Sequence, residues 1–302
     1  MRDAPPAQVH DGRHLAPRLL ILLIGLFPGL VAAGEVTTVD DARVFFSTGV
    51  RRLIVAAGLA RARSAWPVIR TSASGSGVPE ELLFGVAMCE SAFNPFAASS
   101  AGADGVFQFT PDTGAAYGLR CRAERRRLAT SAAAAARHLA DLHSAFGSWE
   151  LALAAYNCGA GRVSQALAQA GGTEWAVIRH ALPRETREYV PRVQYVAAAI
   201  WPRYLAGERG DDKVRLLVAQ PGDTLWRIAR TESADLRVLR VLNGRLVHAG
   251  QEIAVPRADP SIANGPDRIP EAHESPRILP LNGPLTKVAS GSGARRVPGA
   301  DR

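Results

Sequence analysis

The chain has 302 residues, of which 47% are hydrophobic, which is enough for a medium-sized domain and a second small one. Its 36 Lys and Arg residues outnumber its 28 Asp and Glu residues, and the formal charge is +8. A basic chain favours polyanionic partners such as nucleic acid, anionic lipid or an acidic cell-wall polymer. Because the arginines are scattered and not interleaved with aromatic residues, we do not expect a nucleic-acid-binding protein.

The N-terminal residues have the pattern of an export signal. Three arginines precede a charge-free run at residues 19–33, which is short for a membrane span and is interrupted by Pro28-Gly29. Residues 1–33 are therefore predicted to be a cleaved secretory signal peptide, with an uncleaved membrane anchor as the alternative. Cleavage would leave no stable membrane span, so we expect the protein to act in the periplasm or at the cell wall.

Three cysteines, Cys89, Cys121 and Cys158, are too few for a disulfide framework in a chain of this length. They can form at most one bridge, and their spacing fits no familiar metal site. We expect small buried side chains, with Cys89 and Cys158 close together because both flank candidate site residues.

Residues 35–206 are predicted to form one mostly helical domain. Apolar residues recur between arginines over 35–70, and a Ser/Gly turn is expected at 71–77. Pro79 and two acids then begin a helix that stops at Phe93-Asn94-Pro95. Further helices are expected after a loop at 97–118, in which Thr110 caps a short helix, and at 131–146, 149–157, 163–170 and beyond Pro183.

Glu90 lies near the C-terminal end of the helix that begins at Pro79. Leu83, Val86 and Glu90 follow at i, i+3 and i+7, so the carboxylate lies on the apolar face. Loss of hydration there favours the protonated form of a carboxylic acid, which is what a general acid requires. The same spacing is compatible with an ordinary helix-end glutamate that turns to solvent or pairs with an arginine.

A charged linker at 207–213 leads to a second, separate unit at 214–256. Strands are predicted at 214–218 and 252–255, with two helices between them, the first capped by Asp223 and the second at 235–242. Residues 257–302 are rich in proline, glycine, serine and charge, and are predicted to be disordered. The small core of the second unit is expected to consist of Leu225, Ile228, Ala229, Leu239, Leu242 and Ile253.

Four separated motifs resemble the soluble-lytic-transglycosylase-type domain in their order and spacing. They are Glu90-Ser-Ala-Phe-Asn-Pro95, Ser100-Ala-Gly-Ala-Asp-Gly-Val-Phe-Gln-Phe109, Ala155-Tyr-Asn-Cys-Gly159 and Glu185-Thr-Arg-Glu-Tyr-Val190. The second unit resembles a LysM domain through Gly222-Asp-Thr-Leu-Trp-Arg-Ile-Ala229, Leu242-Asn243 and Gly250-Gln251. Together they resemble the membrane-bound lytic murein transglycosylase D group. The resemblance implies a mainly α, lysozyme-like fold (of the α+β superfamily) followed by a small βααβ LysM domain.

The resemblance also implies roles for individual residues. Glu90 would be the catalytic acid and base, with the Tyr156 hydroxyl close to it, and no metal or cofactor would be needed. On the residues alone, Tyr156 and Tyr189 can also be core aromatics, and Gln108 can be a loop-capping amide. The implied substrate-binding residues are Ser99, Ser100, Gln108, Phe109, Tyr156, Asn157 and Tyr189, and the implied glycan-binding residues of the second unit are Gly222, Asp223, Thr224, Leu225 and Asn243.

Most glycosidases use two carboxylates, whereas the motifs supply only Glu90. Asp104 is the one nearby candidate, and it is expected to be solvated in its Gly/Ala loop. The resemblance implies that the N-acetyl group of N-acetylmuramic acid (MurNAc) replaces the second carboxylate and that a 1,6-anhydro product forms. We therefore predict a lytic transglycosylase bound to peptidoglycan strands. The alternatives are a non-catalytic LysM wall-binding protein and a hydrolytic muramidase of goose-lysozyme type.

One departure from the family pattern concerns charge. Relatives often carry Asp-x-Arg where this chain has Arg122-Ala-Glu124. If the two charges pair, they do so here with their signs exchanged, which preserves the attraction. A second departure, Cys158 in place of alanine or serine, is small enough to be tolerated.

Overall fold

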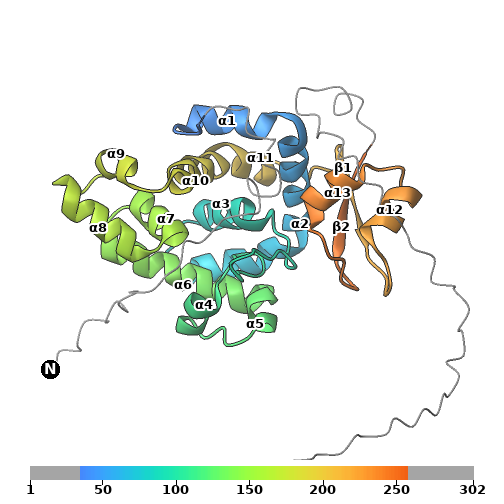
Figure 1. Cartoon of the computed structure of the whole chain (residues 1–302), viewed down its shortest axis with the longest axis horizontal. Coiled ribbons are helices and arrows are strands. Elements are labelled where there is room, and N and C mark those ends of the chain that lie inside the picture. Colours follow the sequence, from blue (N-terminus) through green and yellow to red (C-terminus); the bar gives the residue numbers. More distant parts are fainter. Residues whose placement is uncertain (1–34, 258–302) are drawn as a thin grey trace, which may run out of the picture. The chain divides into compact units, whose positions relative to one another are not determined.

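The computed structural model describes residues 35–257 of the chain. The predicted signal peptide at 1–33 lies outside the described residues, as does the predicted disordered tail apart from Arg257. Within the described residues, helices precede a small two-stranded sheet (Figure 1). The mostly helical character predicted for the first part of the chain is therefore confirmed.

The first two helices are α1 (Val39–Ser47) and α2 (Gly49–Ser74). α2 continues through Pro67 to Ser74 and is capped by Gly75, so the turn predicted to begin at Thr71 is wrong. The hydroxyl groups there donate to carbonyls four residues earlier, as in Thr71 Oγ1 to Pro67 O at 3.0 Å. Such back-bonding satisfies polar side chains inside a helix, which their composition alone does not indicate.

The helix that carries Glu90 is α3 (Glu80–Ser91). It ends two residues before the predicted stop, because Ala92 and Phe93 have left-handed backbone conformations with φ of 48° and 58°. The next helix, α4 (Pro111–Ala116), is capped by Thr110 as predicted, whereas α5 (Arg122–Arg126) was not predicted. A helix of only five residues gives no apolar periodicity that a sequence pattern can reveal.

Figure 1 places α3 in the middle of the helical elements, and it packs against α2, α10 and α11. Its central position follows from its sequence, which is apolar on all sides from Leu83 to Cys89 and is buried there. The remaining helices are α6 (Leu128–Phe146), α7 (Trp149–Cys158), α8 (Ala160–Ala170), α9 (Trp175–Ile178), α10 (Arg184–Tyr195) and α11 (Trp201–Leu205), with a 3₁₀ turn at Arg179–Ala181 and a π-helical turn at Val196–Ile200.

The second unit has the predicted strand–helix–helix–strand order. β1 (Val214–Val218) and β2 (Glu252–Pro256) pair antiparallel, and α12 (Leu225–Thr231) and α13 (Leu236–Asn243) lie between them in the sequence. The predicted cap of α12 is wrong by one residue. Thr224 accepts the Arg227 N–H at 3.2 Å, while the Asp223 carboxylate accepts the Gln220 N–H at 2.8 Å and so closes the preceding turn.

Residues 214–256, which we call the βααβ unit, have two buried faces. Five of the six predicted core residues pack together, but Leu242 joins the main core of the helical part instead. Val214, Val238 and Ala254 join it too, and α2 contacts both β1 and α13. The predicted domain boundaries at 206 and 214 are thus crossed by continuous packing within one compact unit.

The three cysteines are all free. Cys89 and Cys158 are buried as expected, and burial raises the pKa of both thiols, to about 12 for Cys89. Cys121 is exposed at the start of α5, so the expectation of a buried side chain is wrong there.

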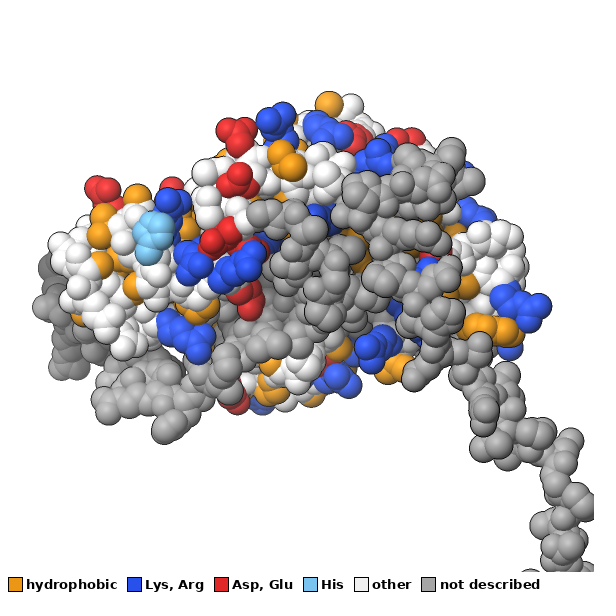
Figure 2. All heavy atoms as spheres, turned by 45° about the horizontal axis from the view of Figure 1, so that its top comes forward, with side chains coloured by type: hydrophobic (Ala, Val, Ile, Leu, Met, Phe, Trp, Pro, Cys, Tyr) orange, Lys and Arg blue, Asp and Glu red, His pale blue; other side chains and the backbone are white. Residues whose placement is uncertain are grey.

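Of the helices in residues 35–257, none combines the length and the apolar character needed to cross a bilayer. On the face shown in Figure 2, basic and acidic side chains are interspersed. Basic side chains therefore form no single patch on the described part of that face.

Candidate active site

Glu90 lies in the last turn of α3 and is only 3% exposed. Its surroundings include Tyr189 of α10, which is 1% exposed. Burial raises the pKa of the Tyr189 hydroxyl well above its usual value, and the charge of Glu90 and the nearby Tyr156 raise it further. Glu90, Tyr156 and Tyr189 are all buried and interact electrostatically, so they belong to one buried cluster.

The loop at 97–109 is fastened beside Glu90 by two hydroxyl groups. Ser91 Oγ, at the end of α3, donates to the Val106 carbonyl at 2.9 Å. Tyr156 Oη, on α7, donates to the Phe107 carbonyl at 2.9 Å. Sequence reasoning assigned no role to Ser91, although a serine directly after the candidate acid was a usable signal. The Tyr156 hydroxyl holds the loop in place.

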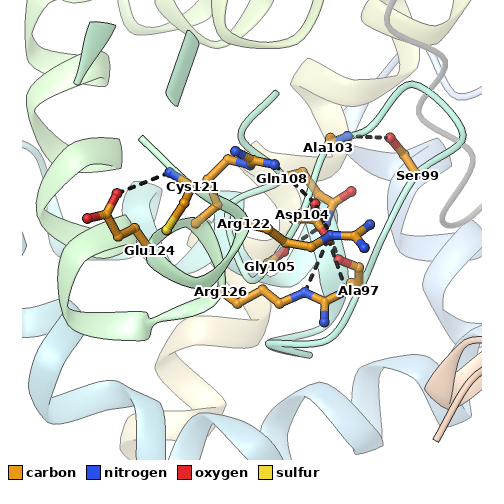
Figure 3. Close-up of polar contacts among 11 residues, drawn as sticks. Ala97, Ser99, Ala103, Asp104, Gly105, Gln108, Cys121, Arg122, Glu124 and Arg126 are labelled. Carbon is orange, nitrogen blue, oxygen red and sulfur yellow. Dashed lines mark hydrogen bonds and ion pairs between the residues drawn. The ribbon is translucent and has the colours of Figure 1, made fainter. Parts of the chain in front are cut away.

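Gln108 stabilises this loop from within. Its backbone has a left-handed conformation with φ of 50°, and its Nε2 donates to the Ala97 and Gly105 carbonyls at 3.1 and 2.8 Å (Figure 3). The loop-capping role that the sequence left open is therefore present. Its Oε1 is buried, with no hydrogen-bond partner among residues 35–257, so the acceptor capacity of this oxygen is unused.

Asp104 is not solvated, so that expectation is wrong. Its side chain is 1% exposed, and Arg122 Nε lies 3.0 and 2.9 Å from its two carboxylate oxygens. Arg125 and Arg126 add contacts at 3.4 and 3.2 Å, and Figure 3 shows Arg122 and Arg126 converging on the carboxylate. All three arginines come from α5, the helix that sequence reasoning missed. Asp104 is thus a structural counter-ion and not a free second carboxylate.

The close approach of the loop and α5 also explains Gly105. Its φ is 81°, and a Cβ atom there would lie 2.3 Å from the Arg125 carbonyl oxygen. Only glycine combines this backbone conformation with the space available.

Arg122 and Glu124, the two charges considered as a possible pair, each bind a different partner. Arg122 binds Asp104 instead, and the Glu124 carboxylate accepts the N–H groups of Arg120 and Cys121 at 2.5 and 3.2 Å. Glu124 therefore caps α5, which in turn presents its arginines to the loop.

The other predicted substrate-binding residues fall into two groups. Ser99 and Ser100 lie at the outer side of the loop, where Ser99 Oγ accepts the Ala103 N–H at 3.0 Å. Phe109 is 1% exposed and packs among aromatic rings, including that of Tyr156. Asn157 links α7 to α10, because its Oδ1 accepts the hydroxyl of Thr186 at 2.7 Å. Ser99 and Ser100 are therefore accessible to a ligand. Phe109 and Asn157 are buried and support the loop and the helices from the interior.

The predicted glycan-binding residues of the βααβ unit are also divided. Gly222 and Thr224 are exposed, Asp223 is half-buried and Leu225 is buried in the small core. Asn243 is 2% exposed, and its Nδ2 donates to the Leu239 and Ala254 carbonyls, both at 2.9 Å. The Asn243 side chain therefore points inward and joins α13 to β2.

Comparison with known proteins identifies the segment that carries most of these contacts. Residues 67–178 match the family model described as Transglycosylase SLT domain. The SLT segment contains Glu90, the loop with Asp104 and Gln108, and Tyr156, but it ends before Tyr189 and the βααβ unit.

Two curated relatives share part of this region. Membrane-bound lytic murein transglycosylase D from Escherichia coli (strain K12) is 39% identical over 125 residues, which are 38% of this chain and 27% of that protein. Membrane-bound lytic murein transglycosylase C from Haemophilus influenzae (strain PittEE) is 45% identical over 53 residues, 18% of this chain and 15% of that protein. The chain thus matches about a quarter or less of the length of these relatives.

Among solved structures, the 70 kDa soluble lytic transglycosylase from Escherichia coli aligns with a TM-score of 0.41 at 27% identity. The alignment covers 48% of this chain and 25% of that one.

Proposed function

We propose that the chain is a lytic transglycosylase that cleaves the MurNAc-β-1,4-GlcNAc bond of peptidoglycan, where GlcNAc is N-acetylglucosamine, and leaves 1,6-anhydro-MurNAc ends. The match to the SLT domain and the similarity to two lytic murein transglycosylases support the reaction class. The observation that carries the proposal is the buried Glu90 beside a fastened loop, together with the engagement of Asp104 by three arginines. The lysozyme-like fold belongs to the same proposal.

A single carboxylate then has to perform two proton transfers. Glu90 donates its proton to the glycosidic oxygen, while the N-acetyl oxygen of MurNAc attacks the anomeric carbon and the GlcNAc alcohol departs. The carboxylate of Glu90 next takes the proton of the MurNAc 6-hydroxyl. That oxygen attacks the anomeric carbon, the acetamido group is released, and Glu90 returns to its protonated form. No water is consumed in this sequence of steps.

Substrate contacts are proposed along the same loop. Gln108 is the best supported, because its Oε1 has no hydrogen-bond partner among the described residues and can accept one from a sugar hydroxyl or amide once the loop gives access to it. Ser99 and Ser100 would contact the saccharide from the outer side of the loop, and Tyr189 from the side of Glu90. Phe109, Tyr156 and Asn157 would act by holding these groups in place.

The βααβ unit is proposed to be a LysM domain that binds GlcNAc-containing glycan. Its exposed turn, with Gly222, Asp223 and Thr224 above the buried Leu225, is the proposed contact. Binding there raises the local concentration of glycan at the catalytic site. We also propose that residues 1–33 direct export and that the protein acts in the periplasm or at the cell wall.

The direct test of Glu90 is the Glu90→Gln variant, which keeps the shape of the side chain and removes the proton donor. We expect it to lose solubilisation of purified sacculi by at least about 100-fold, a typical contribution of general acid catalysis. Glu81→Gln, at the start of the same helix and half-exposed, is the matched control and should retain activity. Equal activity of Glu90→Gln and the wild type would exclude Glu90 as the acid.

A further inference from the structure

The chain directly after Glu90 has an unusual backbone. Ala92 and Phe93 both have positive φ, a region that residues other than glycine rarely adopt. Ala92, Phe93 and Asn94 are nonetheless buried. A conformation of this kind persists only where surrounding contacts determine it. We call residues 92–96 the post-Glu90 segment. Three of its residues, Ala92, Asn94 and Phe96, contact side chains or backbone that lie outside the SLT segment at 67–178.

The first contact runs through Arg61 of α2, which is 1% exposed. Its Nη1 donates to the Ala92 carbonyl at 3.4 Å, and its Nη2 donates to the Leu242 carbonyl at 3.0 Å and to Asn243 Oδ1 at 2.7 Å. Burial lowers the pKa of Arg61 to about 10, with the charge of Glu252 acting against this shift, so the guanidinium stays charged at neutral pH. One cation thus joins the post-Glu90 segment to α13.

The second contact is direct. Asn94 Nδ2 donates to the Asn243 carbonyl at 3.4 Å, while Asn94 Oδ1 accepts the Phe96 N–H at 3.0 Å. Asn243 is itself fixed to β2, because its Oδ1 accepts the Ala254 N–H at 2.7 Å. The end of α13 is therefore a rigid partner for this segment.

The third contact is aromatic. The ring of Phe96 stacks on His248 with centroids 4.8 Å apart and planes at 16°. The guanidinium of Arg126, which also binds Asp104, lies 5.7 Å from the centroid of the Phe96 ring. This stack therefore connects the βααβ unit both to the post-Glu90 segment and to the Asp104 cluster.

The peptide that leads into the βααβ unit is packed as well. A Cβ atom on Gly210 would lie 2.3 Å from the Ala56 carbonyl oxygen, so the backbone at Gly210 packs directly against α2. Arg63 of α2 pairs with Asp211 at 2.5 Å. Together with the shared core, these contacts pack the βααβ unit and the peptide before it against α2, whereas a flexibly tethered module would make few such contacts.

We propose that the βααβ unit positions Glu90, by holding the post-Glu90 segment through Arg61, Asn243 and the Phe96–His248 stack. The inference rests on the proposed catalytic role of Glu90, and it makes Arg61, Asn243 and His248 positioning residues. A unit that served only as a tether would affect binding to the wall and leave turnover of a short soluble glycan unchanged.

The test uses the full chain with His248→Ala, which removes a half-buried ring, and Leu246→Ala as the matched control in the same loop. Leu246 is 74% exposed and makes no contact used above. On short soluble glycan strands, we expect kcat to fall by about three- to tenfold in His248→Ala, from the usual worth of an aromatic pair, with KM nearly unchanged. His248→Phe keeps a stacking ring and should restore kcat, which a loss of general stability would not explain.

Amide hydrogen exchange gives a second readout that does not depend on activity. We expect faster exchange at residues 91–96 in His248→Ala, and wild-type rates in Leu246→Ala and His248→Phe. Unchanged exchange in His248→Ala overturns the inference, whatever the activity. Unchanged kcat with weaker sacculus binding overturns it as well, in favour of a tether. If Glu90→Gln is fully active while exchange responds as expected, the proposed function fails and the mechanical coupling stands.

Discussion

Two buried charges hold the chain around Glu90, and they are compensated in different ways. The Asp104 carboxylate is bound by three guanidinium groups, all from α5. The Arg61 guanidinium is bound by two backbone carbonyls and one amide oxygen, from segments far apart in the sequence. The first arrangement is redundant in its cations and depends on one anion. The second depends on one cation alone, so the two should respond differently to the loss of a single partner.

The largest expected effect on stability comes from removal of the Asp104 carboxylate. Asp104→Ala leaves three guanidinium groups around an apolar site, and removal of one member of a buried ionic cluster typically costs about 3–5 kcal/mol. Urea unfolding followed by circular dichroism measures this change, with the exposed Asp112→Ala as a control. A loss smaller than about 1 kcal/mol would mean that the arginines are satisfied elsewhere, contrary to the structural role of Asp104.

Arg61→Met comes next. It keeps the length of an apolar stem and removes three hydrogen bonds at the junction with α13, which leaves the amide oxygen of Asn243 without one of its donors. We expect a loss of about 2 kcal/mol in the free energy of unfolding. The same urea titration reports it, and Arg70→Met, at an exposed position of the same helix, is the comparison. Equal stability of the two variants would show that the junction contributes nothing to folding.

The redundancy at Asp104 predicts a smaller effect for one arginine. Arg122 is 60% exposed, and Arg125 and Arg126 remain bound to the carboxylate when it is removed. We expect Arg122→Ala to cost about 1 kcal/mol or less. A loss as large as that of Asp104→Ala would contradict the redundancy and make Arg122 the essential partner.

The smallest effect concerns pH. Burial and the charges of Arg126 and Arg122 lower the pKa of His248 from its usual 6.5. The unfolded chain then binds the proton more readily than the folded one, so the contribution of His248 to stability is present above about pH 6.5 and declines as pH falls below it. Thermal unfolding of wild type and His248→Phe between pH 7.5 and 5 should show a steeper decline in the wild type. Parallel curves would exclude this effect.

The sequence predicted those parts of the fold in which pattern and packing agree. The periodic helices and the two strands of the βααβ unit were expected, because each presents a regular apolar face over several residues. Thr71 to Ser74 were misread because their composition favours a turn, whereas their hydroxyls bond back into α2. The helix α5 is too short for any period to be visible.

The site was harder to predict than the fold. Glu90, Gln108 and Tyr156 were proposed as site residues through motifs, but the contacts around the loop depend on side chains that the motifs do not describe. Asp104 looked solvated because its arginine partners lie 18 to 22 residues further along the chain. Asn243 was expected to face a glycan, and only its hydrogen bonds reveal its inward role.

The central claim is that one carboxylate performs both proton transfers and that no water enters the product. Mass spectrometry of the muropeptides that the full chain releases from purified sacculi tests this most directly. We predict MurNAc ends lighter than reducing ends by one water, with none released by Glu90→Gln. Reducing ends would contradict the account and indicate a hydrolytic muramidase, and an absence of any release by the wild type would indicate a wall-binding protein.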